Sequence, residues 1–264
     1  MSEKIGIAMN PTICIFEDPQ YVNLLPLVYT RPVYDLRCGI LTLREKLVRA
    51  YPKTRLAMLC RPYLAEVVRR QNPGVEVNEV HESGCLLLNG RLLAGNGLAK
   101  QIPVRGNDAV FLSGGTVVAV RINTGRHASL RNDFSEAFDA EHFSDLEKVH
   151  VDVNLIRYPW DLVQHNGQQI AADYKSITSG KKSRGKVFPG VHLINKRQIF
   201  VDAGAQIKSG AVLDATNGPI YIGKSAEILP NAVIEGPASI GMETRIKIGA
   251  KIYENTSIGE MCKI

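Results

Sequence analysis

The chain has 264 residues, of which 45% are hydrophobic and 22% charged, and its net charge is +6. This apolar content can fill one large core or two modest ones, so we expect a soluble globular protein. No apolar run approaches the ~20 residues of a membrane span, and the first ten residues lack the apolar segment of a signal peptide. We therefore expect a cytoplasmic protein with no membrane partner. Five cysteines at irregular spacing predict neither a zinc site nor a disulfide framework.

The first informative stretch runs from Leu24 to Lys46 and places four cations around Gly39: Arg31, Arg37, Arg44 and Lys46. It follows a short apolar strand at 13–16 and leads into a predicted helix at 36–50, with one apolar stripe formed by Leu36, Ile40, Leu43 and Leu47. Main-chain N–H groups at a helix start and forked guanidinium groups favour a bound anion. The alternative is that the cations solvate the outer face of the helix. Periodicity favours that alternative for Arg44 and Arg49 and leaves both interpretations open for Arg31 and Arg37.

Basic residues are concentrated in the same part of the chain. Between Pro26 and Asn72 there are ten Lys or Arg residues against only Asp35, Glu45 and Glu66. A nucleic-acid partner would usually bring exposed aromatic residues or a recognisable module, so we expect no nucleic acid. A nucleotide or another polyphosphate accounts for the charge more simply.

Strand-like and helix-like patterns then alternate along the first half. We expect strands at 55–60, 75–80, 85–89 and 149–153, a hairpin at 109–121, and helices at 63–71, 134–143 and 162–174. Repeated β-α-β units predict an α/β domain with a doubly wound sheet, whose ligand sites lie at the carboxyl ends of its strands.

Two of those carboxyl ends carry polar residues. The first strand ends in Glu17 and Asp18, and the strand at 85–89 ends in Asn89, Gly90 and Arg91. Asn89 could hold a metal ion or a ribose hydroxyl group, and Arg91 a phosphate. A plain Asn-Gly turn, which needs no ligand, explains the same residues equally well.

Beyond residue 178 the pattern changes completely. Residues 179–187 are polar, basic and glycine-containing, as expected of a linker between a domain at 1–178 and another at 188–264. In the second domain an isoleucine recurs at every sixth position: Ile222, Ile228, Ile234, Ile240, Ile246, Ile252, Ile258 and Ile264. A small residue stands four positions after each of the first seven. A period of six fits neither a helix nor a coiled coil but fits a triangular β-solenoid with six residues per side.

The two halves together resemble a known family. The period-six ladder resembles that of the hexapeptide-repeat transferases, whose fold is a left-handed parallel β-helix. An α/β domain before such a helix is similar to the bifunctional sugar-1-phosphate nucleotidyltransferase/acetyltransferase family, here in a divergent bacterial branch. The matching segments are Phe16-Glu17-Asp18, Pro26-Leu27, Thr30-Arg31-Pro32, Asp35-Leu36-Arg37, Gly39, Thr42, Glu45-Lys46, Asn89-Gly90-Arg91 and Tyr158-Pro159-Trp160-Asp161.

The resemblance implies a nucleotidyl transfer to a sugar 1-phosphate, with N-acetylglucosamine 1-phosphate and UTP as substrates by likeness alone. It assigns Arg37 and Lys46 as the catalytic cations, and Mg²⁺ as the cofactor. The substrate-binding residues would be Arg31, Gly39, Thr42, Asn89 and Arg91. Asn89 stands where the family normally has a metal-binding aspartate, so Asp18 or Asp35 would have to supply the carboxylate.

The resemblance also implies a homotrimer assembled through the β-helix. Acetyl transfer in the family depends on a histidine on later coils, and this chain has no histidine after His192. The ladder also stops at Ile264 without a capping segment, so we expect a longer parent protein. Two alternatives therefore stand beside the nucleotidyltransferase: an acyltransferase whose catalytic coils lie beyond this sequence, and a non-catalytic nucleotide-sugar-binding scaffold.

Overall fold

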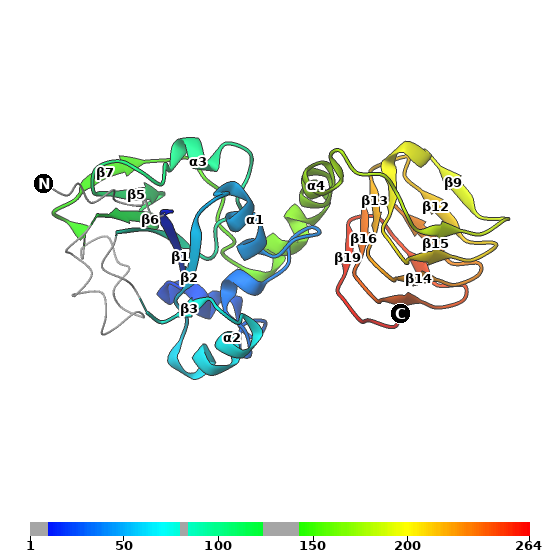
Figure 1. The fold of residues 1–264 in the computed structure, drawn as a ribbon, viewed down its shortest axis with the longest axis horizontal. Coiled ribbons are helices and arrows are strands. Elements are labelled where there is room, and N and C mark those ends of the chain that lie inside the picture. Colours follow the sequence, from blue (N-terminus) through cyan, green and yellow to red (C-terminus); the bar gives the residue numbers. More distant parts are fainter. Residues whose placement is uncertain (1–9, 80–83, 124–142) are drawn as a thin grey trace, which may run out of the picture. The chain divides into compact units, whose positions relative to one another are not determined.

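The computed structural model describes residues 10–79, 84–123 and 143–264 and divides the chain into two compact units (Figure 1). The first unit comprises residues 1–36 and 42–159, and the second comprises residues 37–41 and 160–264. The helix at 159–178 thus belongs almost wholly to the second unit, whereas the sequence pattern grouped residues 1–178 together.

The first unit is built on one seven-stranded sheet with the order β3-β2-β1-β4-β6-β5-β7. Its strands are β1 (Thr12–Phe16), β2 (Arg55–Met58), β3 (Glu76–Val77), β4 (Cys85–Asn89), β5 (Ala109–Ser113), β6 (Thr116–Ile122) and β7 (Glu147–His150). Strands β1 to β4 run parallel to one another, β6 is antiparallel to β4 and β5, and β7 is parallel to β5. The apolar strands β1 and β4 lie at the centre because their side chains are buried on both faces.

Among the described residues, helical crossovers join β1 to β2 and β2 to β3 of this mixed sheet. The chain passes from β1 to β2 through the short 3-10 helices Pro19–Leu24 and Val33–Asp35 and the helix α1 (Leu43–Ala50). It passes from β2 to β3 through the 3-10 helix Pro62–Leu64 and α2 (Ala65–Gln71). Between β4 and β5 lies only the four-residue α3 (Leu98–Gln101). The α/β class is therefore confirmed, while the doubly wound arrangement is not established.

Several predicted elements need correction. The helix expected at 36–50 begins only at Leu43, because Thr42 and Glu45 form a capping box at its start. Leu36 and Ile40 are buried, but outside the helix. The strand expected at 149–153 is β7, which ends at His150. The helix expected at 134–143 lies almost wholly outside the described residues.

The second unit contains the solenoid that the six-residue period predicts. Three four-stranded parallel sheets form its sides, with the orders β10-β13-β16-β19, β17-β14-β11-β8 and β18-β15-β12-β9 (Figure 1). The strands are β8 (Lys186–Val187), β9 (His192–Ile194), β10 (Ile199–Val201), β11 (Gln206–Ile207), β12 (Val212–Asp214), β13 (Ile220–Ile222), β14 (Glu227–Ile228), β15 (Val233–Glu235), β16 (Ala238–Ile240), β17 (Arg245–Ile246), β18 (Lys251–Ile252) and β19 (Thr256–Ile258).

The isoleucine ladder forms the core of this solenoid. Ile222 lies beside Ile240, and Ile240 beside Ile258, in successive coils of one sheet. A residue with positive φ precedes the small residue at many corners, as Ser225, Asn231 and Glu243 do. These left-handed positions turn the chain sharply, and the small side chain that follows is buried inside the corner.

Helix α4 (Pro159–Thr178) and the segment 37–41 complete the second unit. Ile170, Tyr174 and Ile177 of α4 form an apolar cluster with the solenoid residue Phe200, whose ring stacks on that of Tyr221 at 5.7 Å between centroids. Ile40 and Leu41 belong to the same cluster. No helix in the described part of the chain, α4 included, is both long enough and apolar enough to cross a bilayer.

Candidate active site

The chemically richest part of the first unit is the carboxyl edge of its sheet. From β1 the chain continues to β2 and β3 on one side and to β4 on the other, so the strand order reverses beside β1. Ligands of open α/β sheets bind outside the carboxyl ends of strands at such a reversal. Charged residues follow three of these strands here: Glu17 and Asp18 after β1, Arg61 after β2, and Arg91 after β4.

Asp18, Asn89 and Arg91 come together in one buried cluster. The Arg91 Nε group donates to Asp18 Oδ1 at 2.8 Å, and its terminal nitrogen donates to Asp18 Oδ2. Asn89 Nδ2 donates to the same Oδ2 at 2.9 Å. Arg91 and Asn89 are 0% exposed and Asp18 is 5% exposed. The sequence placed these three residues at the carboxyl ends of two strands. In the structure their side chains hydrogen-bond to one another.

This cluster does not fit a magnesium site. Asp18 accepts three hydrogen bonds, and the guanidinium group neutralises its charge. The Asn89 oxygen accepts from the Arg91 N–H at 3.0 Å, and its amide group also donates to the Val117 carbonyl oxygen at 3.0 Å. Mg²⁺ needs carboxylate oxygens that are free to coordinate it. Residues 10–79, 84–123 and 143–264 contain no group of three His, Cys, Asp or Glu residues that could hold a metal ion.

A second buried pair, Glu17 and Arg61, stands beside the first. Arg61 Nε lies 3.1 Å from Glu17 Oε2, and an Arg61 terminal nitrogen lies 3.2 Å from Glu17 Oε1. The backbone N–H of Arg61 donates to Glu17 Oε2 as well, at 3.0 Å. The guanidinium group packs over the rings of Tyr21 and Tyr63, at 4.3 and 5.2 Å from their centroids. Arg61 is therefore fixed by charge, hydrogen bonds and aromatic faces together.

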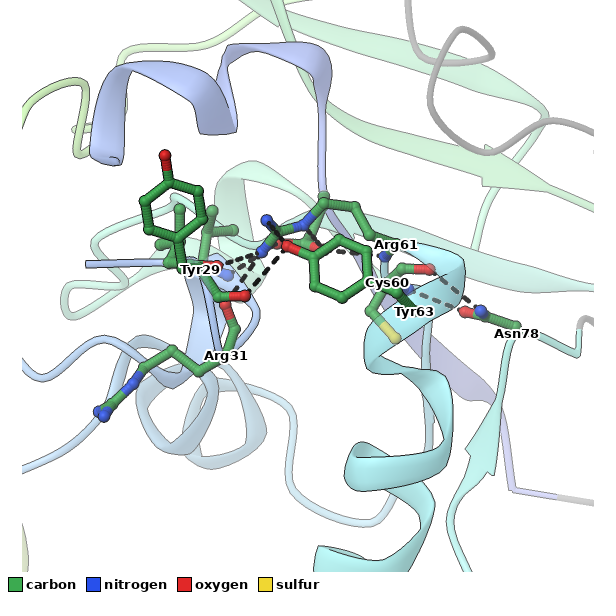
Figure 2. A network of polar contacts seen from close by, with 9 residues as sticks. Tyr29, Arg31, Cys60, Arg61, Tyr63 and Asn78 are labelled. Atoms are coloured by element: carbon green, nitrogen blue, oxygen red, sulfur yellow. Dashed lines mark hydrogen bonds and ion pairs between the residues drawn. The ribbon is translucent and has the colours of Figure 1, made fainter. Parts of the chain in front are cut away.

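Arg61 fixes the loop that carries Arg31 (Figure 2). Its guanidinium group donates to the carbonyl oxygens of Val28 at 2.7 Å and Arg31 at 3.0 Å. Glu17 Oε1 accepts from the Val33 N–H at 2.9 Å, which holds the other end of the loop. The side chain of Arg31 points away from this network and is exposed (Figure 2). Among the described residues none forms a hydrogen bond or ion pair with this guanidinium group.

Arg44 and Asp35 form a third pair, with Arg44 Nε 2.8 Å from Asp35 Oδ1. Burial raises the pKa of Asp35, and the Arg44 charge partly opposes that shift. Arg44 also donates to the Asn72 side chain. Asp35, the alternative metal ligand, is thus already paired with Arg44. Through Asn72, Arg44 also links this pair to the end of α2.

The segment around Gly39 does bind an anion, but the anion is a side chain of the same unit. The N–H groups of Ile40 and Leu41 donate to Asp173 Oδ2 of α4 at 2.9 and 3.1 Å. The Gly39 N–H donates to Asn166 Oδ1 at 2.7 Å. The sequence predicted that these N–H groups lie at the start of a helix. They do not, because α1 begins only at Leu43. The amide groups expected to face a phosphate are already occupied.

Gly39 is required for this packing. Its φ is +87°, and a Cβ atom there would lie 2.6 Å from Asp173 Oδ2 and 2.7 Å from the Gln169 backbone. The Arg37 side chain donates to the Ile40 carbonyl oxygen and lies 3.6 Å from Glu260 of the solenoid. The structure therefore places Arg37 and Gly39 in the second unit, whereas Arg31, Asn89 and Arg91 are in the first.

The other two candidate residues lie at the start of α1. Thr42 Oγ1 accepts from the Glu45 N–H at 3.2 Å, and the Thr42 N–H donates to Glu45 Oε2 at 2.7 Å. Lys46 is buried on the same helix. Thr42 thus serves as a helix cap in the structure.

Sequence reasoning missed the roles of Glu17 and Arg61. In the sequence Arg61 is one of ten cations between Pro26 and Asn72, although it follows β2 as Asp18 follows β1. The placement of charged residues directly after neighbouring parallel strands was the signal that could have found this pair.

Comparison with protein families gives one result that covers this region. A family model described as sugar nucleotidyl transferase matches residues 13–182, which is more than half of the chain. The match includes both buried pairs, the exposed Arg31 and all of α4. Comparison with curated proteins finds no match.

Proposed function

The chain belongs to the sugar nucleotidyl transferase family, and we propose that it joins a sugar 1-phosphate to a nucleoside triphosphate, giving a nucleotide sugar and pyrophosphate. We further propose UTP and N-acetylglucosamine 1-phosphate as the substrates, from the likeness of the sequence to the bifunctional transferases. The family match supports the reaction class, and the choice of base and sugar is our proposal alone.

The reaction asks little covalent chemistry of the protein. An oxygen of the sugar 1-phosphate attacks the α-phosphorus of the triphosphate, and the bond from that phosphorus to the oxygen bridging to the β-phosphate breaks as pyrophosphate leaves. Cations that neutralise the developing charge, and groups that hold both phosphates in line, can supply the catalysis. A site that offers arginines, and no catalytic nucleophile activated by a general base, meets this requirement.

We assign the phosphate contact at the sheet edge to Arg31. Its guanidinium group is exposed, and its backbone is held by Arg61 at 3.0 Å. This preorganised loop is the observation on which the assignment rests. Arg37 is engaged by Glu260, and Lys46 is buried, so neither has an equally accessible charge. Forked guanidinium groups suit phosphate because two N–H groups can meet two oxygens at once.

The two buried pairs act as the frame of this site. Glu17 with Arg61 and Asp18 with Arg91 hold the turns after β1, β2 and β4 in fixed positions. We expect magnesium to arrive with the triphosphate as part of the substrate, because Asp18 is already neutralised by Arg91 and does not fit a resident ion.

The test is a measurement of pyrophosphate release by the purified chain with a panel of nucleoside triphosphates and sugar 1-phosphates, each with magnesium. We expect turnover with one pair, UTP with N-acetylglucosamine 1-phosphate, well above all others. Turnover with a different pair would keep the reaction and overturn the substrates. Silence across the panel from protein that still binds a nucleotide sugar would overturn the proposed reaction in favour of a binding scaffold.

A further inference from the structure

The first coil of the solenoid carries an unbalanced positive charge. Residues 174–201 contain seven Lys or Arg residues and no Asp or Glu residue. Six of them lie on or just before the first coil, and we call these six the first-coil basic cluster: Lys181, Lys182, Arg184, Lys186, Lys196 and Arg197. The rest of the solenoid is balanced, since residues 202–258 contain five basic and six acidic residues. The charge is therefore a property of this one coil.

All six side chains are exposed. Within the part of the chain that the structure describes, none of them is joined to a carboxylate by an ion pair. Lys186 lies over the ring of Phe188, with Nζ 4.4 Å from the centroid, and Lys208 of the next coil lies 4.3 Å from the same centroid. Two cations thus share one aromatic ring.

The cluster surrounds one end of the solenoid. Strands β8, β9 and β10 are the terminal strands of the three sheets, as Figure 1 shows for β9 beside β12. The segment before β8 follows the same edge, because the Arg184 N–H donates to the Val201 carbonyl oxygen at 2.9 Å and Ser183 Oγ accepts from the Val201 N–H at 3.0 Å. The end of a stack of coils offers a broad surface rather than a groove.

Apolar side chains stand among these charges. Val187 is 41% exposed and Ile194 is 44% exposed. Val187 lies beside Ile207 at the end of an inward-facing column, whereas Ile194 lies beside Asp214 on the outer face. An alternative is that the cations only protect the terminal strands from pairing with other chains. Acidic residues would serve that purpose as well, and protection does not explain the exposed apolar side chains. The combination of cations and apolar side chains is the one that binds at a bilayer interface.

We propose that the first-coil basic cluster docks the protein on the surface of a membrane rich in anionic phospholipids. Single-stranded nucleic acid fits the charge but not the chemistry of the coil, because Lys186 and Lys208 already lie over the ring of Phe188 and the ring of Phe200 is buried. Single strands need free aromatic faces for stacking. The lack of a spanning segment does not bear on this contact, which is peripheral. The inference is independent of the proposed catalytic activity.

The test is flotation of the full chain with two kinds of vesicle, phosphatidylcholine alone and phosphatidylcholine mixed with phosphatidylglycerol. We expect binding to the anionic vesicles only, and its loss at high salt. Each cation near an anionic surface strengthens binding by about fivefold. The triple variant Lys181→Gln, Lys182→Gln, Arg184→Gln should therefore bind about 100-fold more weakly.

Two further variants make the result decisive. The matched control Lys247→Gln, Lys251→Gln, Lys263→Gln removes three exposed cations from the last coils and should change binding by less than about threefold, because these residues lie three or more strand spacings of about 4.8 Å from the first coil, beyond about one Debye length. Ile194→Ser leaves the charge intact and should weaken binding by about threefold to tenfold. No binding by the wild type, or equal losses in the two triple variants, would overturn the proposal. Duplex DNA bound more tightly than anionic vesicles, or no effect of Ile194→Ser, would overturn the bilayer in favour of another polyanion.

Discussion

The two positively charged regions of the molecule use their cations in opposite ways. At the carboxyl edge of the sheet, Arg61 and Arg91 are buried, and each is hydrogen-bonded to one carboxylate, that of Glu17 and that of Asp18. Around the first coil of the solenoid, six cations are exposed and none is joined to a carboxylate by an ion pair within the described residues. An arginine buried against a carboxylate holds the structure together. An exposed cation that is not paired with a carboxylate keeps its charge available to a ligand.

The loop that carries Arg31 depends on both a buried and an exposed arginine. Its carbonyl oxygen is held by the buried Arg61, while its own side chain is exposed (Figure 2). A buried arginine thus positions an exposed one. If this division of roles is right, substitutions of buried arginines should change stability, and substitutions of exposed ones should change binding.

The largest expected effect is at Arg91. Arg91→Met leaves the Asp18 carboxylate buried and unpaired, which should lower the free energy of unfolding by about 3–5 kcal/mol in urea denaturation. The double variant Asp18→Asn, Arg91→Met removes the orphaned charge and should recover a part of that loss. A loss below about 1 kcal/mol for Arg91→Met would show that the pair does not hold the sheet edge.

Gly39→Ala should have the next largest effect. The residue has positive φ, and the added methyl group would meet Asp173 and the backbone of α4 below 3 Å. We expect a loss of about 2 kcal/mol or more in the free energy of unfolding. Gly74 also has positive φ, but nothing lies within 4 Å of the Cβ position there, so Gly74→Ala is the matched control and should cost only about 1 kcal/mol. Equal losses in the two variants would mean that the contact with α4 contributes nothing.

The smallest expected effect is at the exposed pair of Arg245 and Glu227. Their side chains are 52% and 31% exposed, and the shortest nitrogen to oxygen distance is 2.7 Å. An exposed pair contributes about 0–1 kcal/mol, so Arg245→Gln should change urea stability by less than about 1 kcal/mol. A loss as large as that of Arg91→Met would break the contrast between buried and exposed pairs.

The solenoid could be predicted almost completely from sequence, and the first unit with its candidate site only in part. Ile228 and Ile246 recur in phase because each side of a coil takes six residues, so one local rule fixes their neighbours. The segment at 37–41 obeys no such rule, since its amide groups bind Asp173, more than a hundred residues later in the chain. The apolar spacing of Leu36 and Ile40 imitated a helix, although these side chains are buried by tertiary contacts.

The candidate site shows the same division. Asp18, Asn89 and Arg91 were expected at one sheet edge because parallel strands bring their carboxyl ends together, and the structure joins them by hydrogen bonds. What the sequence could not reveal was that Asp18 and Arg91 satisfy each other. Pairing between strand ends depends on side-chain geometry, which no periodic pattern encodes. The same holds for Glu17 and Arg61.

The most direct test of this account compares kcat/KM for pyrophosphate release by the wild type, Arg31→Gln and Arg49→Gln. Arg49 is an exposed cation on α1 and serves as the matched control. We predict that Arg31→Gln lowers kcat/KM by about 10-fold to 100-fold with unchanged urea stability, because a charge-assisted phosphate contact contributes about 1.5–3 kcal/mol. Arg49→Gln should match the wild type. Unchanged kcat/KM in Arg31→Gln would contradict the assignment of the phosphate contact to the loop that Arg61 holds.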